Sequence, residues 1–403
     1  MSLFEGVLST PEMLSVFSER SFVDAMLRFE AALARSQARL GIIPESAAQS
    51  IAGSCKVELF DVAKMVRDGA RAGSVAAPLL HGLKEAVGLF NAEAMPFVHF
   101  GIGDEDLVDT AMALLTREAV ALVETDLAKA VQALLLLAQR HAETPMLART
   151  STWPTSVTSF GLVCAGWAAP LVRSRGRLAE AARRGLQVQL GGAGGTLDRM
   201  QGQGAALRRQ MAEALGLRDP GVAWHTQRDE WLAIGCELGL MVGSLGTLAK
   251  DILLLGQHEI GEVAEPGESG RGERPPMAQG GEPRASMVAL AAAQRAPQRV
   301  AALLAAMPQA HPGALGGWQA ELAEWPQLLL SAHGSVRALA GALPGLHVDA
   351  ARMRSNIDRL RAELPRGAAA EGLDPALADP AGVLALAQVP ALQSPPDLYD
   401  DTR

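Results

Sequence analysis

Residues 106–144 read DLVDTAMALLTREAVALVETDLAKAVQALLLLAQRHAET and contain neither glycine nor proline. Apolar residues recur at helical spacing along the whole stretch, from Leu107 and Leu114 through Val120 to Leu127 and Leu134. As one helix the stretch would be about 58 Å long, at a rise of 1.5 Å per residue. A proline follows directly and ends it. The stretch therefore predicts a helix much longer than the average helix of a globular domain.

Three further runs have the same helical pattern, at residues 225–263, 285–307 and 318–343. The first contains glycines at 235, 239, 243 and 246, and small residues at such spacing permit helices to approach closely. The other two contain prolines at 297 and 326, where we expect bends. The chain is 49% hydrophobic but only 4% aromatic, so its core must consist of Ala, Leu and Val. These features predict an all-α fold with a long central bundle that packs against copies of itself.

The chain divides into three parts. Residues 1–105 form shorter helices, the first of which is capped by Ser9 or Thr10 with Pro11 in its first turn. Residues 106–345 form the central bundle of long helices. Residues 346–403 form a short, partly irregular C-terminal segment, which is interrupted by several prolines and has an acidic end.

Charge and composition exclude several classes of function. The net charge is −8 and no basic stripe appears, so we expect no nucleic-acid partner. The most apolar stretch, residues 232–248, contains Glu237 and several glycines, which favours a core helix and no membrane partner. No signal peptide is visible, and Cys55, Cys164 and Cys236 are far apart, as in a reducing cytoplasm. We expect a cytoplasmic protein.

No motif for a cofactor or a metal is present. The cysteines and histidines show no metal-ligand spacing. The glycine-rich GGAGG at residues 191–195 does not follow a clear strand, so it fails the context test for a nucleotide-binding loop. We therefore predict neither a cofactor nor a metal ion.

Several short segments together resemble one enzyme family. They are FVHFGIGDEDLVDTA at 97–111, LARTSTWPTSVTSFG at 147–161, WHTQRDEW at 224–231, GRGERPPMAQGGEPRASMVAL at 270–290 and AMPQAHPGALGGWQAE at 306–321. They resemble the signature regions of the fumarase/aspartase superfamily, and most closely those of its bacterial 3-carboxy-cis,cis-muconate cycloisomerase branch. The resemblance covers roughly residues 3–360.

The resemblance implies a homotetramer with a helical core and with active sites shared between subunits. It also implies a reaction on a small carboxylate substrate. A proton is removed or added next to a carboxylate, through a carbanion stabilised as an aci-carboxylate. Such chemistry needs a base within hydrogen-bond reach and donors directed at the anionic intermediate.

The signature loop departs from the family pattern G-S-S-x-M-P-x-K-x-N-P. Met277 and the proline at 283 match it. The two serines fall on Arg274 and Pro275, so the usual serine base is absent. The carboxylate-binding lysine falls on Gly280 and the asparagine on Glu282. Arginine is not deprotonated in proteins and proline has no acidic group, so neither can act as the base.

A second site segment is also altered. His99 and Asp106 match the family pattern V-H-W-G-A-T-S-Q-D, but the hydroxyl-bearing pair becomes Gly103 and Asp104, and the glutamine becomes Glu105. Ionised carboxylates only accept hydrogen bonds, so they would repel a polyanion. The structural interpretation makes these acids the cap and first turn of the long helix, and it explains them without a functional role.

The segments supply our candidate site residues. As catalytic residues we name His99, His225 and Arg228. Alternatively, Arg228, with Gln227 and Asp229, could fix the start of a core helix and the subunit contact. As substrate-binding residues we name a group placed by the same motif matches, namely His81, Arg149, Thr150, Arg274, Met277 and His311.

Two hypotheses about function follow. The first is a divergent cycloisomerase-like lyase with little or no standard lactonising activity. The second is a catalytically inactive relative kept as a structural or regulatory scaffold. The framework motifs survive while polar site residues are replaced. Selection for a different task and alteration of the loops relative to a functional parent both remain open explanations.

Overall fold

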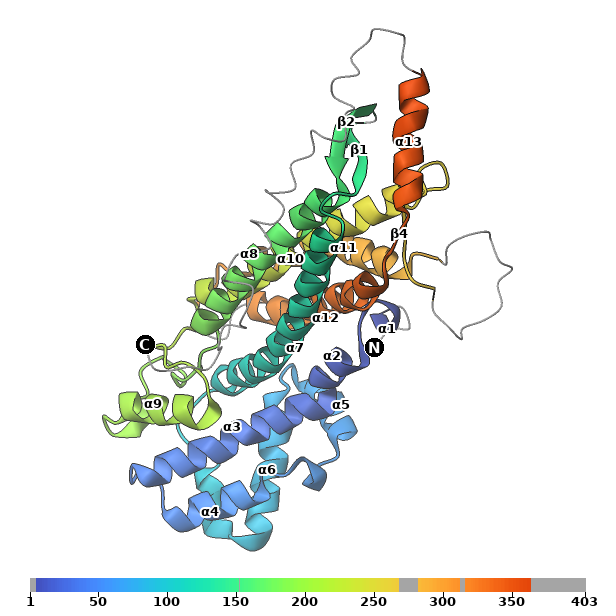
Figure 1. Cartoon of the computed structure of the whole chain (residues 1–403). Coiled ribbons are helices and arrows are strands. Elements are labelled where there is room, and N and C mark those ends of the chain that lie inside the picture. Colours follow the sequence, from blue (N-terminus) through green and yellow to red (C-terminus); the bar gives the residue numbers. More distant parts are fainter. Residues whose placement is uncertain (1–4, 152, 268–281, 312–315, 364–403) are drawn as a thin grey trace.

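The structure is a computed structural model, and it describes residues 5–151, 153–267, 282–311 and 316–363 (Figure 1). Helices dominate this part of the chain, and its strands form two sheets of two strands each. The all-α prediction is confirmed.

The N-terminal region contains six helices. The first two pack on the long helices, and the other four surround an apolar core of their own. Phe29 and Leu83 are fully buried there, and Leu107, Leu114 and Leu207 from later elements join them. The predicted cap is confirmed, because Thr10 Oγ1 accepts from the backbone N–H of Met13 at 3.1 Å. The elements are α1 (Glu5–Leu8), α2 (Pro11–Val16), α3 (Glu19–Arg39), α4 (Glu45–Ser54), α5 (Val62–Ala72) and α6 (Ala76–Phe90), with 3₁₀ turns at Val57–Leu59 and Ala92–Phe97.

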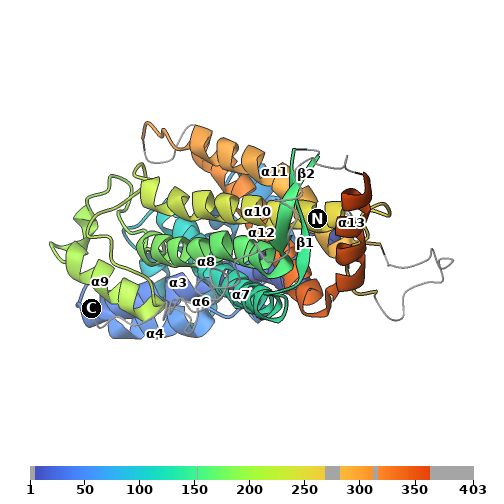
Figure 2. The same ribbon diagram turned by 45° about the horizontal axis from the view of Figure 1, so that its top comes forward.

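Five long helices form the bundle, and α7 runs along its whole length (Figure 1). Figure 2 shows α8, α10 and α11 side by side, with α9 at one end and a β-hairpin at the other. The predicted long helices are confirmed, with shorter ends at 140 rather than 144 and at 229–255 rather than 225–263. The bounds are α7 (Asp104–Arg140), α8 (Phe160–Gly185), α9 (Gly204–Leu215), α10 (Asp229–Leu255), α11 (Arg284–Ala306) and α12 (Gly317–Ala342).

Glycines on α10 allow α11 and α12 to pack closely against it. A Cβ at Gly246 would lie 2.4 Å from the Cβ of Ala293, and one at Gly239 would lie 2.7 Å from a methyl of Val300. A Cβ at Gly235 would meet Leu303 and Trp325 at 3.3 Å. The small residues therefore set the separation of the helices, as the sequence predicted. Gly243 has open space around it.

Helix α10 is long and apolar enough to span a membrane by length and composition, and no other helix in the described ranges is. Within this chain 56% of its apolar window is buried. It packs against α8, α11 and α12. A core helix of a bundle has the same composition.

A β-hairpin follows α7. Its strands β1 (Pro145–Thr150) and β2 (Trp153–Ser159) pair antiparallel, with an irregularity between Ala148 and Arg149. The strands β3 (Val263–Ala264) and β4 (His347–Val348) pair beside it, and α13 (Ala350–Glu363) packs on the hairpin through Ile357. The sequence did not predict the hairpin. The C-terminal segment, which was expected to be partly irregular, contains the regular helix α13. Residues 364–403 lie outside the described residues.

Candidate active site

A buried polar cluster is centred on the first turn of α7. Asp106 is fully buried and its carboxylate accepts four hydrogen bonds. Oδ1 accepts from the Gly191 N–H at 2.9 Å and from His225 Nε2 at 3.0 Å, and Oδ2 accepts from the Gly192 N–H at 2.7 Å and the Gly103 N–H at 3.0 Å. One carboxylate thereby holds together the start of α7, the glycine-rich loop and the segment before α10. The capping interpretation of these acids is confirmed.

Glycine is required where this loop meets α7. Gly192 has a φ of +68°, in the left-handed region, and a Cβ there would lie 3.0 Å from the carbonyl oxygen of Gly101. The backbone N–H groups of residues 191 and 192 both point at Asp106 as a result. The GGAGG segment is thus a loop between helices that binds a carboxylate of its own chain.

The same turn determines the charge of His225. Burial works against the protonated imidazole, but the hydrogen bond and charge of Asp106, with the charges of Glu105 and Asp109, outweigh it and raise the pKa of His225. The Oε2 atom of Glu105 lies 3.9 Å from His225 Nε2. A histidine held by a carboxylate can exchange a proton near neutral pH, as general acid–base catalysis requires.

His99 lies on the other side of this turn. Its Nδ1 atom is 2.6 Å from Oε1 of Glu30 on α3, and its Nε2 atom is buried, has no hydrogen-bond partner among the described residues and lies 4.0 Å from Asp104. Its φ of +57° is rare for a residue with a side chain. Burial lowers the pKa of His99, but the charge and hydrogen bond of Glu30 and the nearby Asp104 and Asp106 outweigh it, so the pKa is raised. The structure therefore brings His99 and His225 to the same helix end.

Arg228 lies in a buried ion network just before α10. Only 1% of its side chain is exposed, and it donates to Asp109 at 2.6 Å and to Glu321 at 3.2 Å. Its guanidinium also lies 4.5 Å from the ring centre of Trp224. Burial opposes its charge, but the two carboxylates raise the pKa of Arg228 still further. All of these partners belong to the same chain and join α7, α10 and α12.

Arg149 lies at the opposite end of α7. It donates through both terminal nitrogens to Glu262, at 2.7 Å and 3.1 Å, and Glu262 also accepts from Asn356 at 2.8 Å. The neighbouring Thr150 is exposed and its hydroxyl lies 3.3 Å from that of Thr155. The helix between these residues and His225 is about 55 Å long.

The remaining candidates are dispersed. His81 is 76% exposed on α6 and pairs with Glu85 at 3.2 Å. His311 is exposed. Arg274 and Met277 lie outside the described residues. Trp153 is 69% exposed at the tip of the hairpin.

Sequence reasoning missed the carboxylates that hold the basic candidates, namely Glu30, Asp109, Glu262 and Glu321. One sequence feature could have indicated such partners, namely an acidic residue on the buried face of an apolar helix. Asp109, between Val108 and Met112 on α7, is an example. In the described ranges, no group of three or more His, Cys, Asp or Glu side chains could hold a metal ion.

Comparison with known proteins identifies the class. A family model described as "Lyase" matches residues 6–272. The chain belongs to the fumarase/aspartase superfamily of lyases.

Individual proteins of this superfamily are similar to most of the chain. The chain is 41% identical to the 3-carboxy-cis,cis-muconate cycloisomerase of Pseudomonas aeruginosa, over 88% of this chain and 77% of the relative. It is 34% identical to the nitrosuccinate lyase of Streptomyces davaonensis, over 85% and 73%. The crystal structure of the 3-carboxy-cis,cis-muconate lactonizing enzyme from Pseudomonas putida superposes with a TM-score of 0.84 at 38% identity, over 88% of this chain and 79% of that one.

Proposed function

We propose that this protein is a divergent lyase or cycloisomerase that moves a proton at a carbon–carbon double bond next to a carboxylate of a small substrate. The observation that carries the proposal is the placement of two histidines, His99 and His225, each hydrogen-bonded to a carboxylate, at the first turn of α7. The neighbouring carboxylates outweigh burial and raise the pKa of each histidine, which favours the protonated imidazole that a general acid needs.

The charge of the same turn argues for a substrate other than 3-carboxymuconate. Asp104 is about half exposed and Glu105 is buried beside it, where the family has a hydroxyl and an amide. These acids repel a substrate with three carboxylates. In the loop, Pro275 and Gly280 replace the serine base and the lysine. We expect little or no lactonisation, because losing a base typically costs about 10²–10⁴-fold in rate and losing a charge-stabilising donor about 10²–10³-fold.

A steady-state assay tests both parts of this proposal. The purified protein would be offered 3-carboxy-cis,cis-muconate and succinyl compounds with a leaving group on the β-carbon, and His225→Gln would serve as the catalytic control. Turnover of a succinyl compound that the variant loses supports the proposal. Turnover of 3-carboxymuconate at ordinary rates, on the order of 10 s⁻¹, would overturn the proposal that the protein has lost lactonising activity.

We further propose a homotetramer with sites shared between subunits. The candidates Arg149 and His225 lie at opposite ends of α7, so one chain cannot bring them together. Large apolar side chains remain exposed along the bundle, at Leu162, Leu240, Leu254, Met287 and Leu304. Light scattering tests the assembly, and a monomer at micromolar concentration contradicts it. Mixing Arg149→Gln with His225→Gln protein should restore activity if subunits share sites.

The second candidate is a catalytically inactive relative with a scaffold role. The replaced loop residues Arg274, Pro275, Gly280 and Glu282 favour it. A structure determined with a dicarboxylate soaked into crystals would separate the two. A molecule ordered beside His99 supports the enzyme, and an inert protein across the assay panel supports the scaffold.

A further inference from the structure

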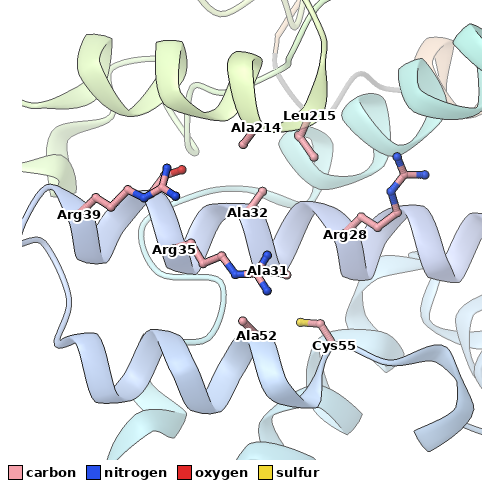
Figure 3. Close-up of a pocket in the computed structure, with 10 residues that line it drawn as sticks. Arg28, Ala31, Ala32, Arg35, Arg39, Ala52, Cys55, Ala214 and Leu215 are labelled. Carbon is pink, nitrogen blue, oxygen red and sulfur yellow. The ribbon is translucent and has the colours of Figure 1, made fainter.

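A concave site lies between the N-terminal helices and α9, apart from the polar cluster at the first turn of α7. It is a cavity of about 390 Å³ between α3, the end of α4 and the C-terminal end of α9 (Figure 3). Cavities that bind small molecules start at about this size. Its lining is formed by Arg28, Ala31, Ala32, Arg35, Ser36, Arg39, Ala52, Cys55, Ala214 and Leu215.

The lining carries three positive charges. Arg28, Arg35 and Arg39 are seven and four residues apart, which places them on one face of α3. Figure 3 shows their side chains on α3 between Ala214 and Leu215 on one side and Ala52 and Cys55 on the other. None of the lining residues is acidic.

Little in the described part of the chain neutralises these charges. Arg28 lies 3.3 Å from Glu118, with both side chains close to half exposed, so this pair is weak. Arg35 and Arg39 have no ion-pair or hydrogen-bond partner among the described residues. Cys55 adds no negative charge, because burial and the nearby Glu30 raise the pKa of its thiol and keep it protonated.

A buried hydroxyl at the same place lacks a partner. Ser36 is 1% exposed, and its Oγ atom makes no hydrogen bond within the described residues. A buried polar group without a partner is costly, and such groups are rare in native proteins. The oxygen of a bound anion would accept a hydrogen bond from this hydroxyl.

The apolar part of the lining indicates the rest of the ligand. Ala31, Ala32, Ala52 and Leu215 offer methyl groups and no charge. The guanidinium group of arginine binds carboxylate and phosphate groups through two parallel hydrogen bonds. We propose that this cavity binds a small organic dianion, with its carboxylate or phosphate oxygens on Arg35, Arg39 and Ser36 and its hydrocarbon part on the alanines and Leu215.

This site is separate from the proposed lyase site. Glu30 lies on the same helix but does not line the cavity, and it holds His99 by a hydrogen bond of 2.6 Å. The substitutions that test the cavity leave His99, His225 and Arg228 unchanged. Failure of this proposal therefore leaves the proposed function untouched.

Calorimetric titration of the full-length protein tests the site. The probes are phenyl phosphate and phthalate, with benzoate as a monoanion of similar size. We expect both dianions to bind and benzoate to bind more weakly. Tighter binding of phenyl phosphate assigns a phosphate ester, and tighter binding of phthalate assigns a dicarboxylate. Absence of measurable binding for both dianions would overturn the proposal.

Three variants distinguish binding at this specific site from non-specific attraction of anions to the charge of the protein surface. Arg35→Gln with Arg39→Gln should weaken dianion binding by about tenfold or more, because bonds to charged groups are the strong ones. Ser36→Ala keeps the volume and every charge, and it should weaken binding by severalfold. Arg209→Gln removes an exposed arginine of α9 that does not line the cavity, and it should leave affinity unchanged. Equal losses in the Arg209 variant and the double variant, or an unchanged Ser36→Ala, would show non-specific attraction and contradict the site.

Discussion

The Nε2 atom of His225 lies 3.0 Å from Oδ1 of Asp106, although the two residues are 119 positions apart in the chain. Asp106 is 0% exposed and its remaining acceptor positions are filled by three backbone N–H groups. The first turn of α7, the loop at residues 191–192 and the segment before α10 therefore depend on one carboxylate. The arrangement orients the imidazole, and it also makes the site sensitive to any change at Asp106.

Replacing Asp106 by asparagine should destabilise the fold. The amide nitrogen cannot accept, so some of the N–H groups around it would be left buried and unpaired. We expect a loss of about 3 kcal/mol in the free energy of unfolding, measured in urea. Asp104→Asn is the matched control in the same turn. It is 45% exposed and its amide oxygen can still accept from Ser74, so its effect should stay below about 1 kcal/mol. Equal effects would show that the four bonds to Asp106 do not hold the turn.

His225 should make stability depend on pH. Its pKa in the folded chain is raised above the ordinary value because Asp106, Glu105 and Asp109 outweigh its burial. A group with a raised folded pKa contributes stability that is full below its unfolded pKa, about 6.5, and is lost as pH rises through the folded pKa. The stability difference between wild type and His225→Gln should therefore shrink as pH rises above the unfolded pKa of about 6.5. Urea unfolding of both proteins below and above this pH checks it, and a constant difference would contradict it.

The sequence predicted the long helices because their apolar stripes and the lack of breaking residues are local features. It placed the end of α7 four residues late, since the turn after Arg140 is closed by a contact between His141 Nδ1 and Thr144 Oγ1 at 3.1 Å. It missed the hairpin as well. The burial of β2 alternates only weakly, between exposed and half-buried positions at its start and between half-buried and buried positions at its end, and pairing with β1 completes the strand.

The basic site residues could be named from motifs, but their partners could not. Glu30 is 69 positions from His99, and Glu321 is 93 positions from Arg228. No local pattern relates residues so far apart, because packing of separate helices decides which side chains meet.

Two glycines of α8 should respond in opposite directions to alanine. A Cβ at Gly161 would lie 2.5 Å from the carbonyl oxygen of Ala138 and 2.7 Å from the Cα of Ala142, so the start of α8 would have to move. We expect Gly161→Ala to destabilise by about 2 kcal/mol, as overpacking typically does. Gly166 has open space around it inside the helix, and Gly166→Ala should stabilise by about 0.5–1 kcal/mol. Urea unfolding of both variants tests the close approach of α8 to the end of α7, and a stabilising Gly161→Ala would contradict it.

Removing Arg228 should be the most damaging change of a single charge in the bundle. Its guanidinium is 1% exposed and lies between the carboxylates of Asp109 and Glu321, which also accept from Trp318 and Trp231. Arg228→Gln would leave two buried acids facing each other, which costs about 3–5 kcal/mol when one partner of a buried pair is lost.

Two measurements test this explanation of the loss: the pH dependence of the stability of Arg228→Gln, and the effect of a second substitution at Glu321. Burial already raises the pKa of Glu321, more than Arg228 opposes it, so without Arg228 this acid should be protonated more readily. The stability lost in Arg228→Gln should therefore become smaller as pH falls, and Glu321→Gln added to Arg228→Gln should recover part of it at neutral pH. Arg183→Gln, which removes a surface arginine of α8 paired with Glu180, should change the free energy of unfolding by less than about 0.5 kcal/mol. The prediction is contradicted if Arg228→Gln loses no more stability than Arg183→Gln. It is also contradicted if adding Glu321→Gln lowers the stability further, because the unpaired acids would then not be the cause of the loss.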